Sequence, residues 1–301
     1  MGTGADSQGY PKRGALANGL FVSVQSELSP VAALLEVMPS FDLGPGNVAA
    51  RVRVVADPAA PRKRFLLPEY YTRIEWLSPT HAHVETNGAT GSIDWSGSGN
   101  DLLQAELAIF PDGAPESLGM FLRLITSMLL PTRRAVLVHA SGVAAAGHGY
   151  VFLGDSGAGK TTTARRIGRD GALRFADDLT VLHLGREEVH VEPCSFDRGG
   201  RLPGREHRSW PLRAAYSVRK AAAVTRDAGR VRDPLATWCG AILSSTGPPG
   251  SLVSLLELAS DLSRLAPPHA LDVSPSGPVL PVLMRQQPGS APSFDQHPHE
   301  I

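Results

Sequence analysis

Residues 150–161 read YVFLGDSGAGKT, and this stretch decides most of what the sequence predicts. Gly154, Gly159, Lys160 and Thr161 occupy every fixed position of the pattern G-x-x-x-x-G-K-[ST]. The apolar residues 150–153 before the pattern favour a strand, and residues 162–167 after it can continue as a helix. A strand, a glycine-rich loop and a helix in this order predict a phosphate-binding loop; an ordinary strand-to-helix turn is the alternative.

The predicted loop implies a nucleotide site. Successive backbone N–H groups at the start of a helix suit polyphosphate oxygens, and glycines let the backbone approach them closely. We expect Lys160 to reach the β and γ phosphates and the Thr161 hydroxyl to be a magnesium ligand. The residues expected to bind the nucleotide are Gly154, Asp155, Ser156, Gly157, Ala158, Gly159, Lys160, Thr161 and Thr162. The expected cofactors are ATP, with GTP as the open alternative, and Mg²⁺.

Two adjacent carboxylates follow a short way along the chain. Asp177 and Asp178 end the strand predicted over residues 173–176, only 17 and 18 residues after Lys160. Neighbouring side chains at a strand end point in opposite directions. One carboxylate can therefore organise Mg²⁺ while the other accepts a proton from an attacking hydroxyl. The alternative is a solvated Asp-Asp turn that leads into the next strand.

Two histidines precede the loop. His139 ends the strand predicted over residues 135–139, 21 residues before Lys160. Its expected function is to contact the transferred phosphate or to help shuttle a proton, and ordinary packing or surface exposure is the alternative. His148 lies in the turn of residues 147–149, and we expect it to be exposed and inert.

Taken together, HASGV (139–143), GDSGAGKT (154–161) and FADD (175–178) resemble the catalytic segment of the HPr kinase/phosphorylase family and of the related kinases found with ribosomally made peptides. The resemblance covers residues 118–285, and its specific motifs lie within residues 139–178. It implies a fold related to phosphoenolpyruvate carboxykinase. Carried over residue by residue, it implies nucleotide and metal roles for Lys160 and Thr161 and catalytic roles for His139, Asp177 and Asp178. Of the two aspartates, Asp177 is the expected general base and Asp178 the expected metal organiser.

One departure from that family narrows the expectation. We find no counterpart of the downstream signature Glu-[hydrophobic]-Arg-Gly-[hydrophobic], because residues 191–201 read VEPCSFDRGGR. The resemblance therefore implies kinase chemistry rather than HPr as the substrate or the phosphorylase half-reaction. It also implies that the chain can form a homo-oligomer.

The pattern along the chain predicts two domains between flexible ends at residues 1–13 and 286–301. Alternating segments between Gly, Pro, Asn and Ser turns predict an antiparallel, β-rich N-terminal domain over residues 14–114. Its strands are expected at residues 50–55, 73–77, 80–86, 92–95 and 103–110. A helix around residues 118–130 then opens an α/β domain over residues 115–285, the expected P-loop kinase core of mixed sheet and helices.

Within this second domain, apolar runs and turn residues place the remaining elements. We expect strands at residues 135–139, 142–146, 150–153, 173–176, 179–184, 189–192, 212–218, 270–273 and 279–284, and helices after the loop and at residues 234–243 and 252–265.

Composition excludes some classes of protein. The 29 Lys and Arg residues balance the 29 Asp and Glu residues, which argues against binding nucleic acid or an anionic membrane through bulk charge. Residues 118–130 are too short to span a bilayer and are interrupted by Arg123. With no export signal visible, the cytoplasm is the expected location. Cys194 and Cys239 are too few for a disulfide framework, and Cys194 is expected to be structural.

Four arginines, at positions 198, 201, 205 and 208, crowd a stretch rich in Gly and Pro. They could hold nucleotide phosphates or an acidic acceptor, and a solvated loop is the alternative. Arg198 and Arg201 are the candidates among them.

The function expected from these observations is an ATP-dependent kinase that transfers the γ-phosphate to a hydroxyl, most plausibly that of serine in a peptide or small protein. Two alternatives stay open: a kinase for a small-molecule hydroxyl, and a nucleotide-dependent binding or switch module that phosphorylates no acceptor.

Overall fold

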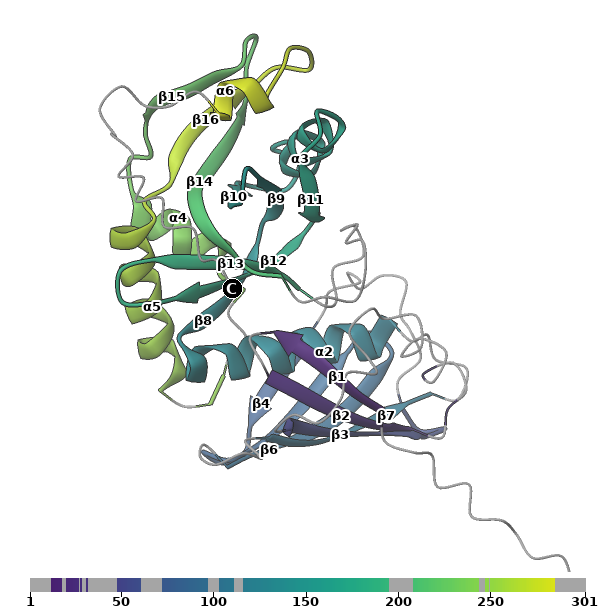
Figure 1. The fold of residues 1–301 in the computed structure, drawn as a ribbon. Coiled ribbons are helices and arrows are strands. Elements are labelled where there is room, and N and C mark those ends of the chain that lie inside the picture. The colour runs from purple at the N-terminus through teal and green to yellow at the C-terminus, as the bar shows by residue number, and fades with distance from the viewer. Residues whose placement is uncertain are drawn as a thin grey trace, which may run out of the picture.

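The residues that the structure describes form two mixed β-sheets with few helices, so the fold is α/β (Figure 1). The computed structural model describes residues 12–17, 20–26, 28, 31, 48–60, 72–96, 103–110, 116–194, 208–243, 247–248 and 250–284. The predicted C-terminal tail and most of the predicted N-terminal tail lie outside these residues, as do Arg198, Arg201 and Arg205. Of the N-terminal end predicted to be flexible, the structure describes Lys12 and Arg13, which are the first two residues of a strand.

The N-terminal sheet has seven strands in the order β1-β2-β3-β7-β6-β5-β4. They are β1 (Lys12–Ala17), β2 (Leu20–Ser26), β3 (Val48–Ala56), β4 (Thr72–Trp76), β5 (His81–Thr86), β6 (Ala89–Trp95) and β7 (Leu103–Ile109). The expectation of an antiparallel sheet is wrong for its centre, because β3 runs parallel to both β2 and β7. Alternation in sequence fixes which side chains of a strand are buried, but strand direction depends on how the connections cross, which alternation does not record.

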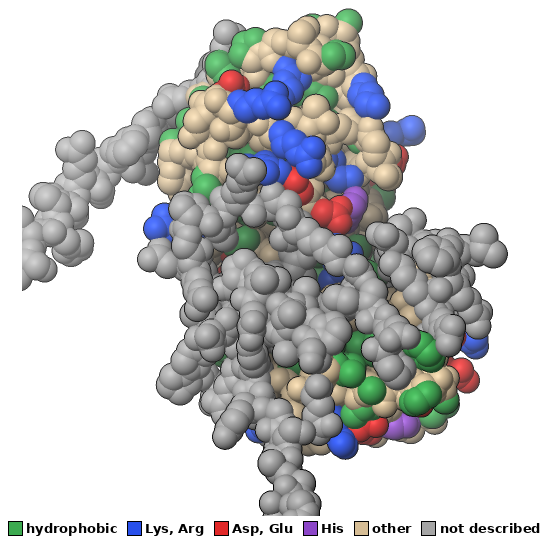
Figure 2. All heavy atoms as spheres, turned by 90° about the vertical axis from the view of Figure 1, so that its right-hand side faces the viewer, with side chains coloured by type: hydrophobic (Ala, Val, Ile, Leu, Met, Phe, Trp, Pro, Cys, Tyr) green, Lys and Arg blue, Asp and Glu red, His purple; other side chains and the backbone are tan. Residues whose placement is uncertain are grey.

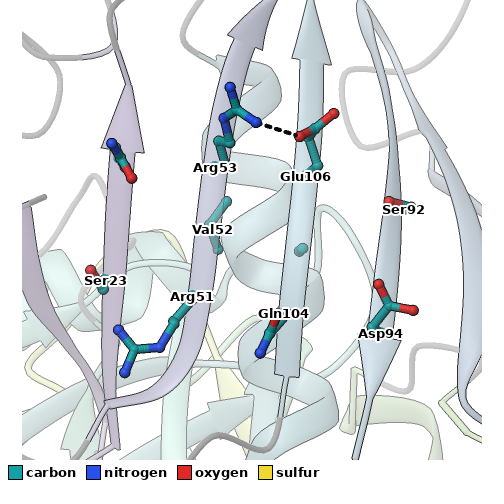
Figure 3. A pocket seen from close by; sticks show the side chains of 10 residues that line it. Ser23, Arg51, Val52, Arg53, Ser92, Asp94, Gln104 and Glu106 are labelled. Carbon is teal, nitrogen blue, oxygen red and sulfur yellow. Dashed lines mark hydrogen bonds and ion pairs between the residues drawn. The ribbon is translucent and has the colours of Figure 1, made fainter. Parts of the chain in front are cut away.

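Only one side of this sheet is apolar. On β3, Val52 and Val54 are buried whereas Arg51 and Arg53 are exposed. The exposed side forms an open groove of about 500 Å³, across which Arg53 contacts Glu106 at 3.4 Å (Figure 3). A polar outer side is ordinary for a sheet that packs against the core on one face.

The second sheet has nine strands. Its path is β11-β9-β10-β14-β13-β12-β8, with β16 beside β14 and β15 beside β16. The strands are β8 (Ala135–His139), β9 (Ser141–Ala145), β10 (His148–Leu153), β11 (Leu173–Ala176), β12 (Leu179–Leu184), β13 (Val189–Pro193), β14 (Trp210–Lys220), β15 (Thr225–Arg230) and β16 (His269–Val273). The long strand β14 runs parallel to β10 and β16 and antiparallel to β13, which makes this sheet mixed as expected.

Helices cover both faces at the centre of this sheet, so β10 is apolar on both sides. Val151 and Leu153 pack with α4 (Pro234–Ala241) and α5 (Ser251–Leu265). Tyr150 and Phe152 pack on the other face with α3 (Lys160–Arg169) and α6 (Leu280–Met284). The apolar run that the sequence shows before the loop is thus a central, buried strand.

The helix α2 (Glu116–Leu129) lies between the two sheets (Figure 1). Its side chains share one core with the apolar side of the N-terminal sheet and with Leu137 of β8 and Val181 of β12. The predicted buried helix around residues 118–130 is confirmed, and one core joins the two sheets through it.

Two further features differ from expectation. The strand predicted at residues 279–284 is wrong: residues 280–284 form the short helix α6, in which the amides of Val282 and Leu283 donate to the carbonyl of Val279. A short apolar run fits a strand and a buried helix equally well, and Pro281 suits a first helical turn. The second feature is a set of strands that the sequence did not predict, namely β1, β2 and β15.

Candidate active site

The glycine-rich loop joins the central strand β10 to α3, in the order that the sequence predicts. Gly154, Gly157 and Gly159 have φ values of 131°, 79° and 105°, a region that side-chain-bearing residues rarely adopt. A Cβ added at Gly154 would also lie 3.3 Å from the Val218 carbonyl oxygen of β14. The loop is therefore fixed by its glycines and by close contact with the neighbouring parallel strand.

Lys160 opens α3 and is buried, with 6% of its surface exposed. Its Nζ donates hydrogen bonds to the carbonyl oxygens of Gly154 at 2.7 Å and Asp155 at 3.1 Å. Burial lowers the pKa of Lys160 below its ordinary value, although the charges of Asp178 and Asp155 act to raise it. An anion placed at this loop would favour the charged ammonium further.

The rest of the loop is more accessible. Asp155, Ser156, Gly157 and Thr162 are exposed, and Gly154, Ala158, Gly159 and Thr161 are partly buried. The structure thus leaves the residues expected to meet the nucleotide open to solvent around a buried ammonium.

Asp177 is enclosed. Its backbone carbonyl accepts hydrogen bonds from the hydroxyls of Thr161 at 3.1 Å and Ser141 at 2.5 Å. Its carboxylate accepts from Arg174 and, at 3.2 Å, from Arg165, and only 11% of this side chain is exposed. Two guanidinium groups therefore hold this carboxylate.

Asp178 is half-exposed and points to different partners. Oδ1 lies 3.0 Å from Nδ1 of His139, and Oδ2 accepts a hydrogen bond of 3.1 Å from Nη2 of Arg123. The hydrogen bond from His139 is the main cause that lowers the pKa of Asp178 below its ordinary value; Arg123 acts in the same direction, and desolvation opposes both. The carboxylate is thus held in its charged form beside an imidazole.

Strand pairing brings these residues together. In the antiparallel register of β8 and β12, His139 lies opposite Leu179, the residue after Asp178. The amide of Ala140 donates to the Asp178 carbonyl at 3.0 Å, and the Thr180 hydroxyl donates to the Ala140 carbonyl at 3.0 Å. The two predicted motifs are therefore adjacent at one edge of the sheet, next to the start of α3.

Arg123 is the site residue that the sequence did not single out. It appears there only as an interruption of the apolar run at residues 118–130. A single charge on an otherwise apolar helix is the one signal that could have pointed to it, because a partly buried cation needs a partner.

Basic side chains gather on the face of α3 and β11, beside acidic and histidine side chains (Figure 2). The arginines of these two elements are Arg165, Arg166, Arg169 and Arg174. Arg166 is directed elsewhere, since its guanidinium donates to the carbonyls of Ser274 and Gly277. Arg208 is the member of the predicted arginine cluster that the structure describes; it is exposed and precedes β14.

The secondary candidates are simple to place. His148 is exposed, as expected, and its Nδ1 lies 2.9 Å from the Ala146 carbonyl oxygen. Cys194 is buried in the core that α2 shares with both sheets, whereas Cys239 is exposed. Neither cysteine belongs to the site.

No known family model and no curated protein matches the chain. Among solved structures, the HPr(Ser) kinase/phosphatase from Coxiella burnetii is similar, at 14% sequence identity and a TM-score of 0.24. The match covers 42% of this chain and 97% of that one. In the part of the chain that the structure describes, no helix combines the length and the apolar character needed to cross a membrane.

Proposed function

We propose that the protein is an ATP-dependent kinase that transfers the γ-phosphate to a hydroxyl, that of serine in a peptide or small protein. The observation that supports this most is the pair of His139 and Asp178, held 3.0 Å apart beside the glycine-rich loop. Asp178 is close enough to Lys160 for its charge to act on the pKa of that ammonium. A phosphate-binding loop and a charged Asp-His pair in one place suit phosphoryl transfer to an external hydroxyl.

The loop's share in this reaction is binding and orientation. Backbone amides at the N-terminus of α3 and the Lys160 ammonium would neutralise phosphate oxygens, which stabilises the charge that develops during transfer. Transfer also depends on holding donor and acceptor in line, which a loop fixed against β14 can do.

Mg²⁺ fits this site as a partner of the nucleotide. Among the described residues, no group of three or more His, Cys, Asp or Glu side chains could hold a metal ion. Magnesium in kinases is commonly held by one or two protein oxygens together with substrate phosphates. We propose that the Thr161 hydroxyl would hold the Mg²⁺ ion. This hydroxyl donates a hydrogen bond to the Asp177 carbonyl. When bound, the ion would neutralise phosphate charge.

The roles that we propose for the two aspartates differ from those implied by the family resemblance. Both carboxylate oxygens of Asp177 contact arginines, and its side chain is only 11% exposed. Asp178 is 48% exposed and already contacts His139. We therefore assign proton acceptance to the Asp178–His139 pair, in which the carboxylate orients the imidazole. Asp177 holds the arginines and, through its carbonyl, Thr161.

The proposal is tested with γ-labelled ATP, Mg²⁺ and peptides or small proteins encoded beside the gene. We expect acid-stable label on a serine of one acceptor. Asp178→Asn should lower kcat by about a hundredfold or more and leave a measurable residual rate, because it removes general-base catalysis. Binding of a fluorescent ATP analogue should stay within about twofold, because the loop is untouched. Asp177→Asn should reduce transfer less.

Three results would count against the proposal. Label released only as free phosphate, with none on any acceptor, would indicate a hydrolase or a switch module. Transfer that survives Asp178→Asn and is lost with Asp177→Asn would restore Asp177 as the base. Nucleotide binding that is unchanged by Lys160→Ala would remove the loop from the site.

A further inference from the structure

Arg123 connects the helix between the two sheets with the site. We propose that Arg123 is a positioning residue: it holds the Asp178 carboxylate in the orientation in which that carboxylate contacts His139. This inference rests on the proposed function of Asp178, and it adds a residue of α2, which lies outside the predicted motifs, to the working parts of the site.

The geometry divides one carboxylate between two partners. Oδ1 of Asp178 lies 3.0 Å from His139, and Oδ2 lies 3.1 Å from Arg123. The terminal torsion of an aspartate is soft, so one contact alone leaves the plane of the carboxylate free to turn. Contacts at both oxygens fix that plane. Arg123 therefore decides whether Oδ1 faces the imidazole.

The guanidinium is itself held by a rigid element. Phe121, Leu122 and Ile125 of α2 are 0% exposed in the core shared by both sheets. The hydroxyl of Ser117 at the start of the helix donates to the carbonyl of Asn87 in the β5–β6 turn at 2.9 Å. An arginine on such a helix has little freedom in its backbone, which suits it to positioning another side chain.

Burial supports a specific role for this arginine. The Arg123 side chain is 27% exposed, and its Nη1 lies 3.7 Å from the sulfur of Met120. A cation that is mostly removed from water loses hydration, which is unfavourable unless a charged partner compensates. The pair Arg264–Asp261 on α5 also forms an ion pair, at 3.3 Å, but its arginine is 64% exposed and so stays largely hydrated. That pair offers a matched control.

The test compares Arg123→Gln, Arg123→Lys and the control Arg264→Gln in the labelled-ATP assay. We expect Arg123→Gln to lower kcat by about tenfold or more, the size of one lost charge-assisted hydrogen bond. The KM for ATP should stay within about twofold, since the loop is not touched. Arg123→Lys keeps the charge and should recover part of the loss. Arg264→Gln should behave as wild type.

A double-mutant cycle separates positioning from general stability. If Arg123 acts through Asp178, then adding Arg123→Gln to Asp178→Asn should lower the residual kcat by about twofold or less. A merely structural arginine would lower kcat by the same factor in both backgrounds. The same four proteins are unfolded in urea, where the two substitutions should be non-additive if the contact exists.

The outcomes are distinguishable. If Arg123→Gln has the same kcat as active wild-type protein, the inference is overturned and the proposed function stands. The same holds if Arg123→Gln lowers kcat by an equal factor with and without Asp178→Asn. Wild-type protein that phosphorylates no acceptor would overturn the proposed function, and the positioning role would fall with it. Additive unfolding free energies would show that the Arg123–Asp178 contact itself is absent.

Discussion

The Nδ1 atom of His139 lies 3.0 Å from Oδ1 of Asp178, so the last residue of β8 contacts the residue that precedes β12. The antiparallel register of these strands makes the contact, because it sets His139 opposite Leu179. Asp178 is close enough to Lys160 of the glycine-rich loop for its charge to act on the pKa of that lysine. Several measurements can test what this arrangement implies.

The first prediction concerns Lys160. Replacing it with Ala should weaken binding of a fluorescent ATP analogue by about tenfold or more, because a buried ammonium facing phosphates makes charge-assisted hydrogen bonds. Lys160→Arg should not restore binding, since the planar guanidinium does not fit where only 6% of the lysine is exposed. Arg186→Ala, on the exposed β12–β13 turn, is the control and should bind as wild type.

The second prediction concerns Gly142 of β9, which packs closely against Phe175 of β11. A Cβ at Gly142 would lie 2.2 Å from Cε2 of Phe175, whose ring stacks on Trp210 with centroids 5.0 Å apart. Gly142→Ala should therefore lower the free energy of unfolding in urea by about 1–3 kcal/mol.

The control for this glycine is Gly119 in α2, where nothing lies within 4 Å of an added Cβ. Gly119→Ala should raise stability by roughly 0.5–1 kcal/mol, because alanine is the better helix former. Equal effects of the two substitutions would contradict the packing role assigned to Gly142.

The third prediction compares the two arginines that hold Asp177. The Arg174 side chain is 17% exposed and that of Arg165 is 60% exposed. Arg174→Gln should lower the free energy of unfolding by about 1.5–3 kcal/mol, since it removes a buried partner of a charged group. Arg165→Gln should cost about 1 kcal/mol or less, as surface ion pairs do. The reverse order in urea unfolding would show that Arg165 is the main partner.

The fourth prediction is a pH dependence. The hydrogen bond from His139 is the main cause of the lowered pKa of Asp178 in the folded protein. A depressed carboxylate pKa stabilises the fold above the ordinary value of about 3.9, and the stabilisation is lost as pH falls through the folded pKa.

The difference in free energy of unfolding between wild type and Asp178→Asn, called here the stability gap, should therefore be largest near pH 7 and shrink below about pH 4. Because Asp178 is half-exposed, the gap should be about 1 kcal/mol or less. Urea unfolding at pH 7, 5 and 3.5 measures it. A gap that grows as the pH falls would contradict the ionised carboxylate.

Local patterns predicted the second sheet well. Strands that are apolar on both faces, such as β10, and helices with a clear period, such as α2 and α5, lie where the sequence places them. Two kinds of feature were missed. The run at residues 279–284 is too short for its period to separate strand from helix. The parallel pairing of β3 depends on the path of its connections, and the alternation of apolar and polar residues carries no information about that path.

The sequence by itself determined the glycine-rich loop between a strand and a helix, because glycines, lysine and threonine within eight residues act through local backbone geometry. Lysine stands there in a chain whose 29 basic residues include only Lys12, Lys63, Lys160 and Lys220 as lysines. Tertiary structure decided how the two aspartates differ. Asp177 and Asp178 are neighbours in sequence, yet one carboxylate meets arginines of α3 and β11 and the other meets His139 and Arg123. Strand register and the packing of α2 between two sheets bring these partners together, and neither is encoded in the spacing of the motifs.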